Sequence, residues 1–161
     1  LKPEHRAFVQ PNAALLGLLG ARKYPYPFVG DLLRSMMIVV HAPDEELFLR
    51  ELTASGMELT LSTVGRVLLR YGVRPHDLAD RAQELWSMFH DSGRVTVVSK
   101  APNEYVVEVA EWPSHDGTVC QMCAEARRYI VGKTGAVVTD ARRLRCQSWG
   151  HATCHFRVRW A

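Results

Sequence analysis

The sequence predicts an α+β domain, in which several helices precede an antiparallel four-stranded sheet built as hairpin, helix, hairpin. Two observations support this prediction. The apolar period changes from about 3.6 residues to 2 after Gly93, so helices give way to strands. All four cysteines fall between Cys120 and the end of the chain, two in a helical stretch and two in the closing hairpin. The C-terminal half is therefore expected to be organised around one cysteine-bearing site.

The first 30 residues are predicted to form an arm and linker ahead of the main domain, which spans residues 31–161. A short leucine-rich helix is expected at residues 15–19. Residues 24–28 contain two prolines, each of which disfavours helical backbone in the residue before it, so this segment is predicted to be a non-helical spacer. Residues 31–40 end in a β-branched run and stay ambiguous between helix and strand.

Three amphipathic helices are predicted to follow. The first begins at the N-cap Asp44 and is expected to stop at Gly56. The second runs over about residues 58–71 with apolar side chains on one stripe. The third begins at Pro75, since proline is favoured in the first helical turn, and stops before Gly93.

Two hairpins flank one further helix in the remainder of the chain. The predicted elements are strands at 94–99 and 105–111, a helix at about 116–131 capped by Ser114 or Asp116, and strands at 136–146 and 153–160. The last strand alternates strictly between apolar and polar residues, which places Cys154 on its inner face. Cys146 is predicted to share a face with Leu144.

The four cysteines are predicted to form a metal site. Cys120 and Cys123 are three residues apart on a helix, so both sulfurs can face one centre. Cys146 and Cys154 flank the loop of the closing hairpin and offer two further thiols. Four thiolates in tetrahedral geometry suit Zn(II) best and an iron–sulfur cluster next.

Other interpretations of the cysteines stay open. Two disulfides require an oxidising compartment, and no secretory segment is visible, so a cytoplasmic location is expected. Four buried, unligated thiols are also compatible with a protein core. A histidine can replace one thiolate, and His151 is better placed for this than His155, which alternates away from Cys154.

Composition and charge exclude few functions. The chain has 161 residues, of which 47% are apolar and 23% charged, as expected for one globular domain. No apolar stretch approaches the roughly 18 residues of a membrane span. The net charge of +3 is concentrated in the C-terminal part of the chain. The candidate basic face there consists of Arg142, Arg143, Arg145, Arg157 and Arg159.

This element order, with cysteines in these places, resembles the 4-vinyl reductase domain superfamily over roughly residues 57–161. The resemblance depends on Cys120, the spacing of 26 from it to Cys146, and the hairpin that ends the chain. In the aromatic-sensing transcriptional activators of this superfamily, a helix cysteine, two hairpin cysteines and a glutamate bind zinc. The glutamate position is Arg143 here, which cannot ligate, and Cys123 would supply the fourth ligand. The helical half also resembles a myxobacterial paralogous family of unknown function.

The resemblance implies a fold like that of vesicle-tethering complex subunits, with an apolar cavity between helices and sheet. It implies a hydrophobic or aromatic small-molecule ligand, a structural zinc with a closed shell that does not activate water, and a sensory or regulatory role. The implied partners are a second copy of the chain in a homodimer and an effector domain or partner protein.

Aromatic side chains are the candidates for contact with such a ligand. The predicted ligand-binding residues are Tyr71, Trp86, Phe89, His90, Tyr105 and Trp112. Among these, His90 is the candidate anchor for a ligand hydroxyl or carboxylate. Simple filling of the core is the alternative role for each of them.

Two other functions are considered. An enzyme is not expected, because no metalloprotease, serine-hydrolase or P-loop motif is present and no catalytic residue can be assigned. The alternative that the chain is a reductase subunit is supported only by the name of the superfamily. A nucleic-acid- or protein-binding module would use the basic face, and its binding would depend steeply on salt.

Overall fold

A computed structural model describes residues 3–4, 24–69, 73–113 and 115–161, with side chains described in α2 only as far as Glu58. The elements, in chain order, are α1 (Tyr26–Val39), α2 (Glu45–Leu69), α3 (Pro75–Asp80), α4 (Ala82–Phe89), β1 (Arg94–Ala101), β2 (Glu104–Ala110), α5 (Gly117–Gly132), β3 (Val138–Arg145), a 3-10 turn (Gln147–Trp149) and β4 (Cys154–Trp160). The predicted α+β class and the hairpin, helix, hairpin order are confirmed.

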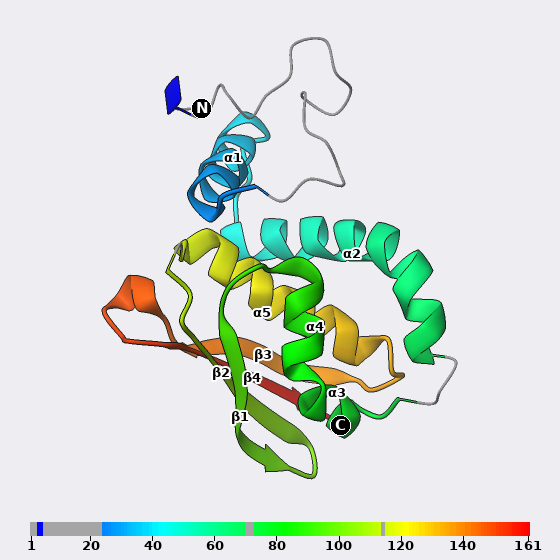
Figure 1. Cartoon of the computed structure of the whole chain (residues 1–161). Helices are drawn as coiled ribbons and strands as arrows, with labels where there is room; N and C mark the ends of the chain where they lie inside the picture. The colour runs from blue at the N-terminus through cyan, green and yellow to red at the C-terminus, as the bar shows by residue number, and fades with distance from the viewer. Residues whose placement is uncertain (1–2, 5–23, 70–72, 114) are drawn as a thin grey trace.

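The four strands form one antiparallel sheet in the order β1-β2-β4-β3. Each hairpin contributes two neighbouring strands, and β2 pairs with β4 to join them. Helix α5 lies on β3 and β4, α2 packs on α5, and α4 contacts β1, so the helices gather on one face of the sheet (Figure 1). The fully buried core includes Val107, Val109 and Phe156 from the central strands.

Helix α1 corrects the prediction that residues 24–28 cannot be helical. The helix begins at Tyr26, with Pro25 as its N-cap and Pro27 in its first turn. Proline is tolerated there because the backbone N–H groups of the first turn have no partner within the helix. The ambiguous residues 31–40 are helical as far as Val39. The helix continues through residue 30, and a division of the chain into arm and domain at that point stays a prediction.

Helix α2 joins two of the predicted helices. Its start is as predicted, because the Asp44 carboxylate accepts a hydrogen bond from the Leu47 backbone N–H at 3.0 Å. The predicted stop at Gly56 is wrong, and the helix runs on to Leu69. A glycine inside a helix costs only about 1 kcal/mol, which the packing of α2 on α5 offsets.

The helix predicted from Pro75 is divided at Arg81, whose φ of −103° and ψ of 17° are not helical. The two short helices α3 and α4 result. The helix predicted at residues 15–19 and the side chain of Tyr71 lie outside the described residues. In the part of the chain that the structure does describe, no helix has the length and apolarity needed to cross a membrane.

A β-bulge changes the alternation of β3. The register against β4 shifts between Arg143 and Arg145, so Leu144 is the extra residue. Leu144 is 39% exposed, whereas Cys146 is fully buried. The prediction that these two share a face is therefore wrong, because one inserted residue reverses the period-2 pattern beyond it.

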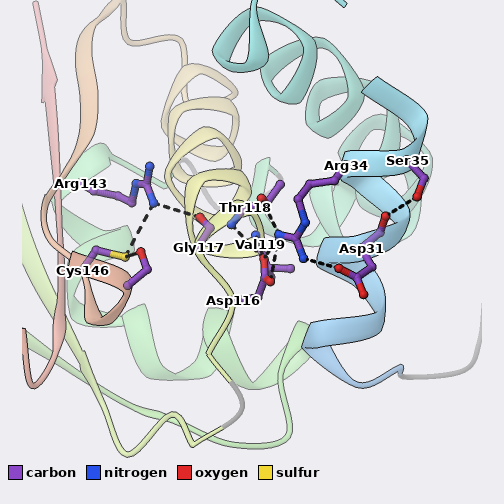
Figure 2. A network of polar contacts seen from close by, with 10 residues as sticks. Asp31, Arg34, Ser35, Asp116, Gly117, Thr118, Val119, Arg143 and Cys146 are labelled. Atoms are coloured by element: carbon purple, nitrogen blue, oxygen red, sulfur yellow. Dashed lines mark hydrogen bonds and ion pairs between the residues drawn. The ribbon is translucent and has the colours of Figure 1, made fainter. Parts of the chain in front are cut away.

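Two glycines give opposite expectations for stability. A Cβ built on Gly30 lies 2.3 Å from the Asp116 carboxylate, whereas one built on Gly56 meets no described atom within 4 Å. Asp116 caps α5 through the Thr118 backbone N–H and pairs with Arg34 of α1 (Figure 2). Gly30→Ala is expected to cost about 2 kcal/mol by displacing this cap.

Gly56→Ala is the matched control, and it is expected to raise the free energy of unfolding by about 0.5–1 kcal/mol because alanine favours the helix. Urea denaturation followed by circular dichroism measures both variants. A shift of both in the same direction would contradict the assigned roles of the two glycines.

Candidate functional site

A cavity of about 660 Å³ lies between the helices and the sheet. Its wall is made by α1, α2, α3, α4, α5 and β2, together with the residues that follow α4. Most of the lining side chains are apolar, including Leu52, Leu85, Met122 and Ile130. A mostly apolar cavity with a few polar groups is the usual form of a site for a small organic ligand.

Four of the six predicted ligand-binding residues line this cavity: Trp86, Phe89, His90 and Tyr105. Trp112 is fully buried and does not belong to the lining. Trp112 packs edge-on against the Trp86 ring at 5.0 Å between centroids, so it supports a residue of the wall from behind. Tyr71 is outside the described side chains, and its role stays a prediction.

His90 stands at the centre of a polar and aromatic cluster. Its ring stacks on Trp86 with 3.6 Å between centroids. Its Nδ1 is 2.7 Å from the Tyr26 hydroxyl, and its Nε2 is 3.8 Å from the Cys123 sulfur. Burial raises the pKa of Tyr26 to about 12, so this hydroxyl keeps its proton at neutral pH. Both imidazole nitrogens of His90 thus have protein neighbours, and its role as a ligand anchor stays a prediction.

A second group of side chains could hold a metal ion: His115, Cys120, Cys146 and Cys154. Their ligand atoms all lie within 4.8 Å of one another. The Cys146 sulfur is 3.6 Å from the Cys120 sulfur and 3.4 Å from His115 Nε2. A tetrahedral zinc ion with bonds of about 2.3 Å to sulfur sets its sulfurs about 3.8 Å apart, so the spacing fits the ion.

Three elements position this group. The N-cap at Asp116 begins α5 directly after His115, and Cys120 lies one turn further along the helix. The hairpin brings Cys146 and Cys154 to the same place, since one precedes the 3-10 turn and the other begins β4. All four cysteines are free thiols in this structure, so the alternative of two disulfides finds no support.

Hydrogen-bond donors surround the hairpin sulfurs. Arg143 donates from Nη1 to the Gly117 carbonyl at 2.9 Å and to the Cys146 sulfur at 3.7 Å (Figure 2). The Ser148 hydroxyl is 2.9 Å from the same sulfur, and the Gln147 backbone N–H donates to the Cys154 sulfur at 3.4 Å. Such donors stabilise thiolates, and a guanidinium offsets their negative charge.

Two thiols of this group, Cys120 and Cys154, have pKa values shifted in opposite directions. A hydrogen bond from Cys120 lowers the pKa of the Cys154 thiol to about 6. The same bond, together with burial, raises the pKa of Cys120. Of these two thiols, Cys154 is the one that loses its proton more readily.

Cys123 lies apart from this group, although it was predicted to be the fourth ligand. Its side chain lines the cavity, next to His90. Burial raises the pKa of the Cys123 thiol to about 12. The two cysteines of the helix therefore belong to different environments: Cys120 faces the hairpin and Cys123 faces the cavity.

The residues of these sites that the sequence does not single out include His115, Tyr26 and Arg127. His115 was missed in favour of His151, which is exposed at the hairpin tip. The available signal was its position directly before the cap of the cysteine helix. Tyr26 was missed because its segment was assigned to a spacer. Arg127 was missed because nothing in the sequence distinguishes it from Arg128, although only the former lines the cavity.

Three of the five arginines of the predicted basic face are paired with carboxylates. Arg142 and Arg157 both contact the Asp140 carboxylate, at 3.2 and 3.0 Å, and Arg159 pairs with Glu104. These contacts neutralise much of the positive charge on the exposed side of the sheet. The nucleic-acid-binding alternative is weakened, because it requires arginines that are available to phosphates.

No protein-family model matches the sequence, and neither does any characterised protein sequence. Solved structures do share its fold. An H-NOX protein from S. oneidensis in the Fe(II) ligation state has a TM-score of 0.64 at 11% identity, over 98% of this chain and 84% of that one. The phenol-responsive sensory domain of the transcription activator PoxR, solved with phenol, has a TM-score of 0.56 at 17% identity, over 98% and 87%.

A third similar structure is trafficking protein particle complex subunit 3 from Naegleria fowleri, covalently bound to palmitic acid. Its TM-score is 0.53 at 15% identity, over 83% of this chain and 93% of that one. The expected likeness to a vesicle-tethering subunit is thus confirmed for the fold. At these identities the comparisons establish the architecture alone.

Proposed function

We propose that this chain is a sensory or regulatory domain that binds a hydrophobic or aromatic small molecule in the cavity between its helices and its sheet. The observation that carries the proposal is the cavity of about 660 Å³ with a mostly apolar lining. The phenol-responsive domain of PoxR, which has the same fold, was solved with phenol, and this favours an aromatic ligand. Membership of the 4-vinyl reductase superfamily is part of the same proposal.

We also propose that a structural zinc is held by His115, Cys120, Cys146 and Cys154. Three thiolates and one imidazole form a common closed zinc site, and the sulfur spacing supports it. The ion would fasten the closing hairpin to α5. With no open coordination position it would not activate water, so the proposed role is binding rather than catalysis.

The location and the assembly are further parts of the proposal. Three reduced thiols in one metal site are suited to the reducing cytoplasm. A homodimer and an effector domain or partner protein stay predictions.

A cavity-filling substitution tests ligand binding. Ala126 lines the cavity from α5, so Ala126→Trp would place an indole in the space reserved for the ligand. Naphthalene derivatives are suitable probes because they are rigid and aromatic. The variant is expected to bind 2-naphthol at least about tenfold more weakly than the unmodified protein, as measured by isothermal titration calorimetry.

Ala101→Phe, at the exposed end of β1, is the control and should bind as the unmodified protein does. A bound ligand at about 100 times its Kd should also stabilise the unmodified protein by about 2.7 kcal/mol. Failure of 2-naphthol, 2-naphthoate and decanoate to bind the unmodified protein would overturn the proposed function.

A further inference from the structure

We infer that the ligand of this cavity is a monocarboxylic acid with an aromatic or hydrocarbon body, and that Arg127 holds its carboxylate. This inference rests on the proposed function and narrows the class of ligand. A neutral phenol, like the one solved with the PoxR domain, lacks the carboxylate that Arg127 would hold. Arg127 is a cation in a lining that is otherwise mostly apolar.

Arg127 lies on α5 and contributes to the lining of the cavity. Its Nη1 donates to the Cys123 carbonyl at 3.1 Å, one turn back along the helix. Its guanidinium carbon lies 4.5 Å from the centroid of the Phe156 ring and 5.6 Å from that of Trp86. These rings fix the guanidinium plane, while a single backbone bond leaves most of its five N–H donors unused by the described residues.

No acidic side chain of the chain forms an ion pair with Arg127. All 17 aspartates and glutamates belong to the part of the sequence that the structure describes. None of them forms an ion pair with Arg127, whereas its neighbour Arg128 pairs with Glu125 at 3.0 Å. A cation in an apolar site without a partner is costly, and an ionised ligand placed there removes that cost.

A second polar group points to the same conclusion. Thr53 of α2 also lines the cavity, and its hydroxyl is buried without a hydrogen-bond partner among the described residues. A carboxylate accepts hydrogen bonds from both a guanidinium and a hydroxyl. The cavity therefore offers donors on two helices. Among the described lining residues Arg127 is the one arginine or lysine, and the single carboxylate, that of Asp91, is exposed on the segment after α4. One guanidinium in this lining suits a monoanion.

The test compares two ligands of the same shape at neutral pH, the anion 2-naphthoate and the neutral 2-naphthamide. Calorimetry should show that the unmodified protein binds the acid at least about tenfold more tightly than the amide. Arg127→Met keeps an apolar stem and removes the charge. It should abolish this preference, so that the acid and the amide bind the variant with similar affinity. Arg127→Lys should retain part of the preference, and Arg142→Met, an exposed arginine of β3, should retain all of it.

The outcomes separate the two proposals. Binding of the amide and the acid with equal affinity, or an undiminished preference in Arg127→Met, would overturn the carboxylate inference and leave the proposed function intact. Absence of binding by the acid, the amide and the neutral 2-naphthol would overturn both. Because the preference of the unmodified protein is itself decisive, the test does not depend on the folding of any variant.

Discussion

Replacing Cys154 with alanine is expected to unfold the closing hairpin and α5, and with them the whole domain. The thiol is fully buried and belongs to the metal-binding group. Binding of a structural zinc contributes about 10–16 kcal/mol in small metal-dependent folds. A domain of this size has a total stability of only about 5–15 kcal/mol. Loss of the proposed ion would therefore remove a free energy as large as the total free energy of unfolding of the domain. A chelator that extracts the ion should unfold the domain in the same way.

The identity of the fourth ligand is tested by a matched pair of variants. His115→Ala should lose the ion, and His115→Cys should regain it as a four-thiolate site. Cys123→Ala should keep about one zinc per chain, with a cost of only about 1 kcal/mol for the missing sulfur.

Elemental analysis of reduced protein and thermal denaturation measure both effects. Loss of zinc from Cys123→Ala, with His115→Ala unchanged, would restore the ligand set predicted from the sequence. Iron in place of zinc would contradict the zinc assignment.

Loss of the two arginine partners of a buried carboxylate is expected to give the second-largest effect. The Glu125 side chain is fully buried in α5, and its Oε2 accepts from Arg50 of α2 at 3.2 Å and from Arg128 at 3.0 Å. The double variant Arg50→Met/Arg128→Met leaves this carboxylate buried without a cation. It should lower the free energy of unfolding by about 3–5 kcal/mol, as measured by urea denaturation.

The apolar substitution at the same site is the informative control. Glu125→Met removes the buried charge and fills a similar volume, so it should cost less than about 1.5 kcal/mol. Arg94→Met, which breaks an exposed pair with Glu111, should cost less than about 1 kcal/mol. An equal cost for Glu125→Met and the double variant would show that the carboxylate is stabilising in itself.

The sheet and α5 were predictable from the sequence because local patterns determine them. The period-2 runs place β1, β2 and β4 close to their observed bounds, and Asp116 caps α5 as one of two predicted candidates. The helices were less predictable, because tertiary packing outweighed the local sequence preferences for ending or excluding a helix. Gly56 does not end α2, and the prolines of residues 25 and 27 begin α1 rather than prevent it.

The candidate metal group shows a similar limit. Spacing alone indicated Cys120, Cys146 and Cys154, but it could not distinguish the two sides of one helix. Cys123 shares a stripe with Cys120 only approximately, and three residues on an α-helix correspond to a rotation of about 300°. The remaining 60° turns its sulfur towards the cavity, while His115 approaches from the preceding loop.

Helix α5 bears both Cys120 and Arg127, which lie seven residues apart, less than two full turns along the axis. One helix thus borders both the cavity and the group of side chains that could hold a metal ion. If a bound ligand displaced α5, the metal-binding group would move with it, because a helix translates and rotates as a unit. Binding of a ligand in the cavity would consequently change the position of the exposed tip of the last hairpin.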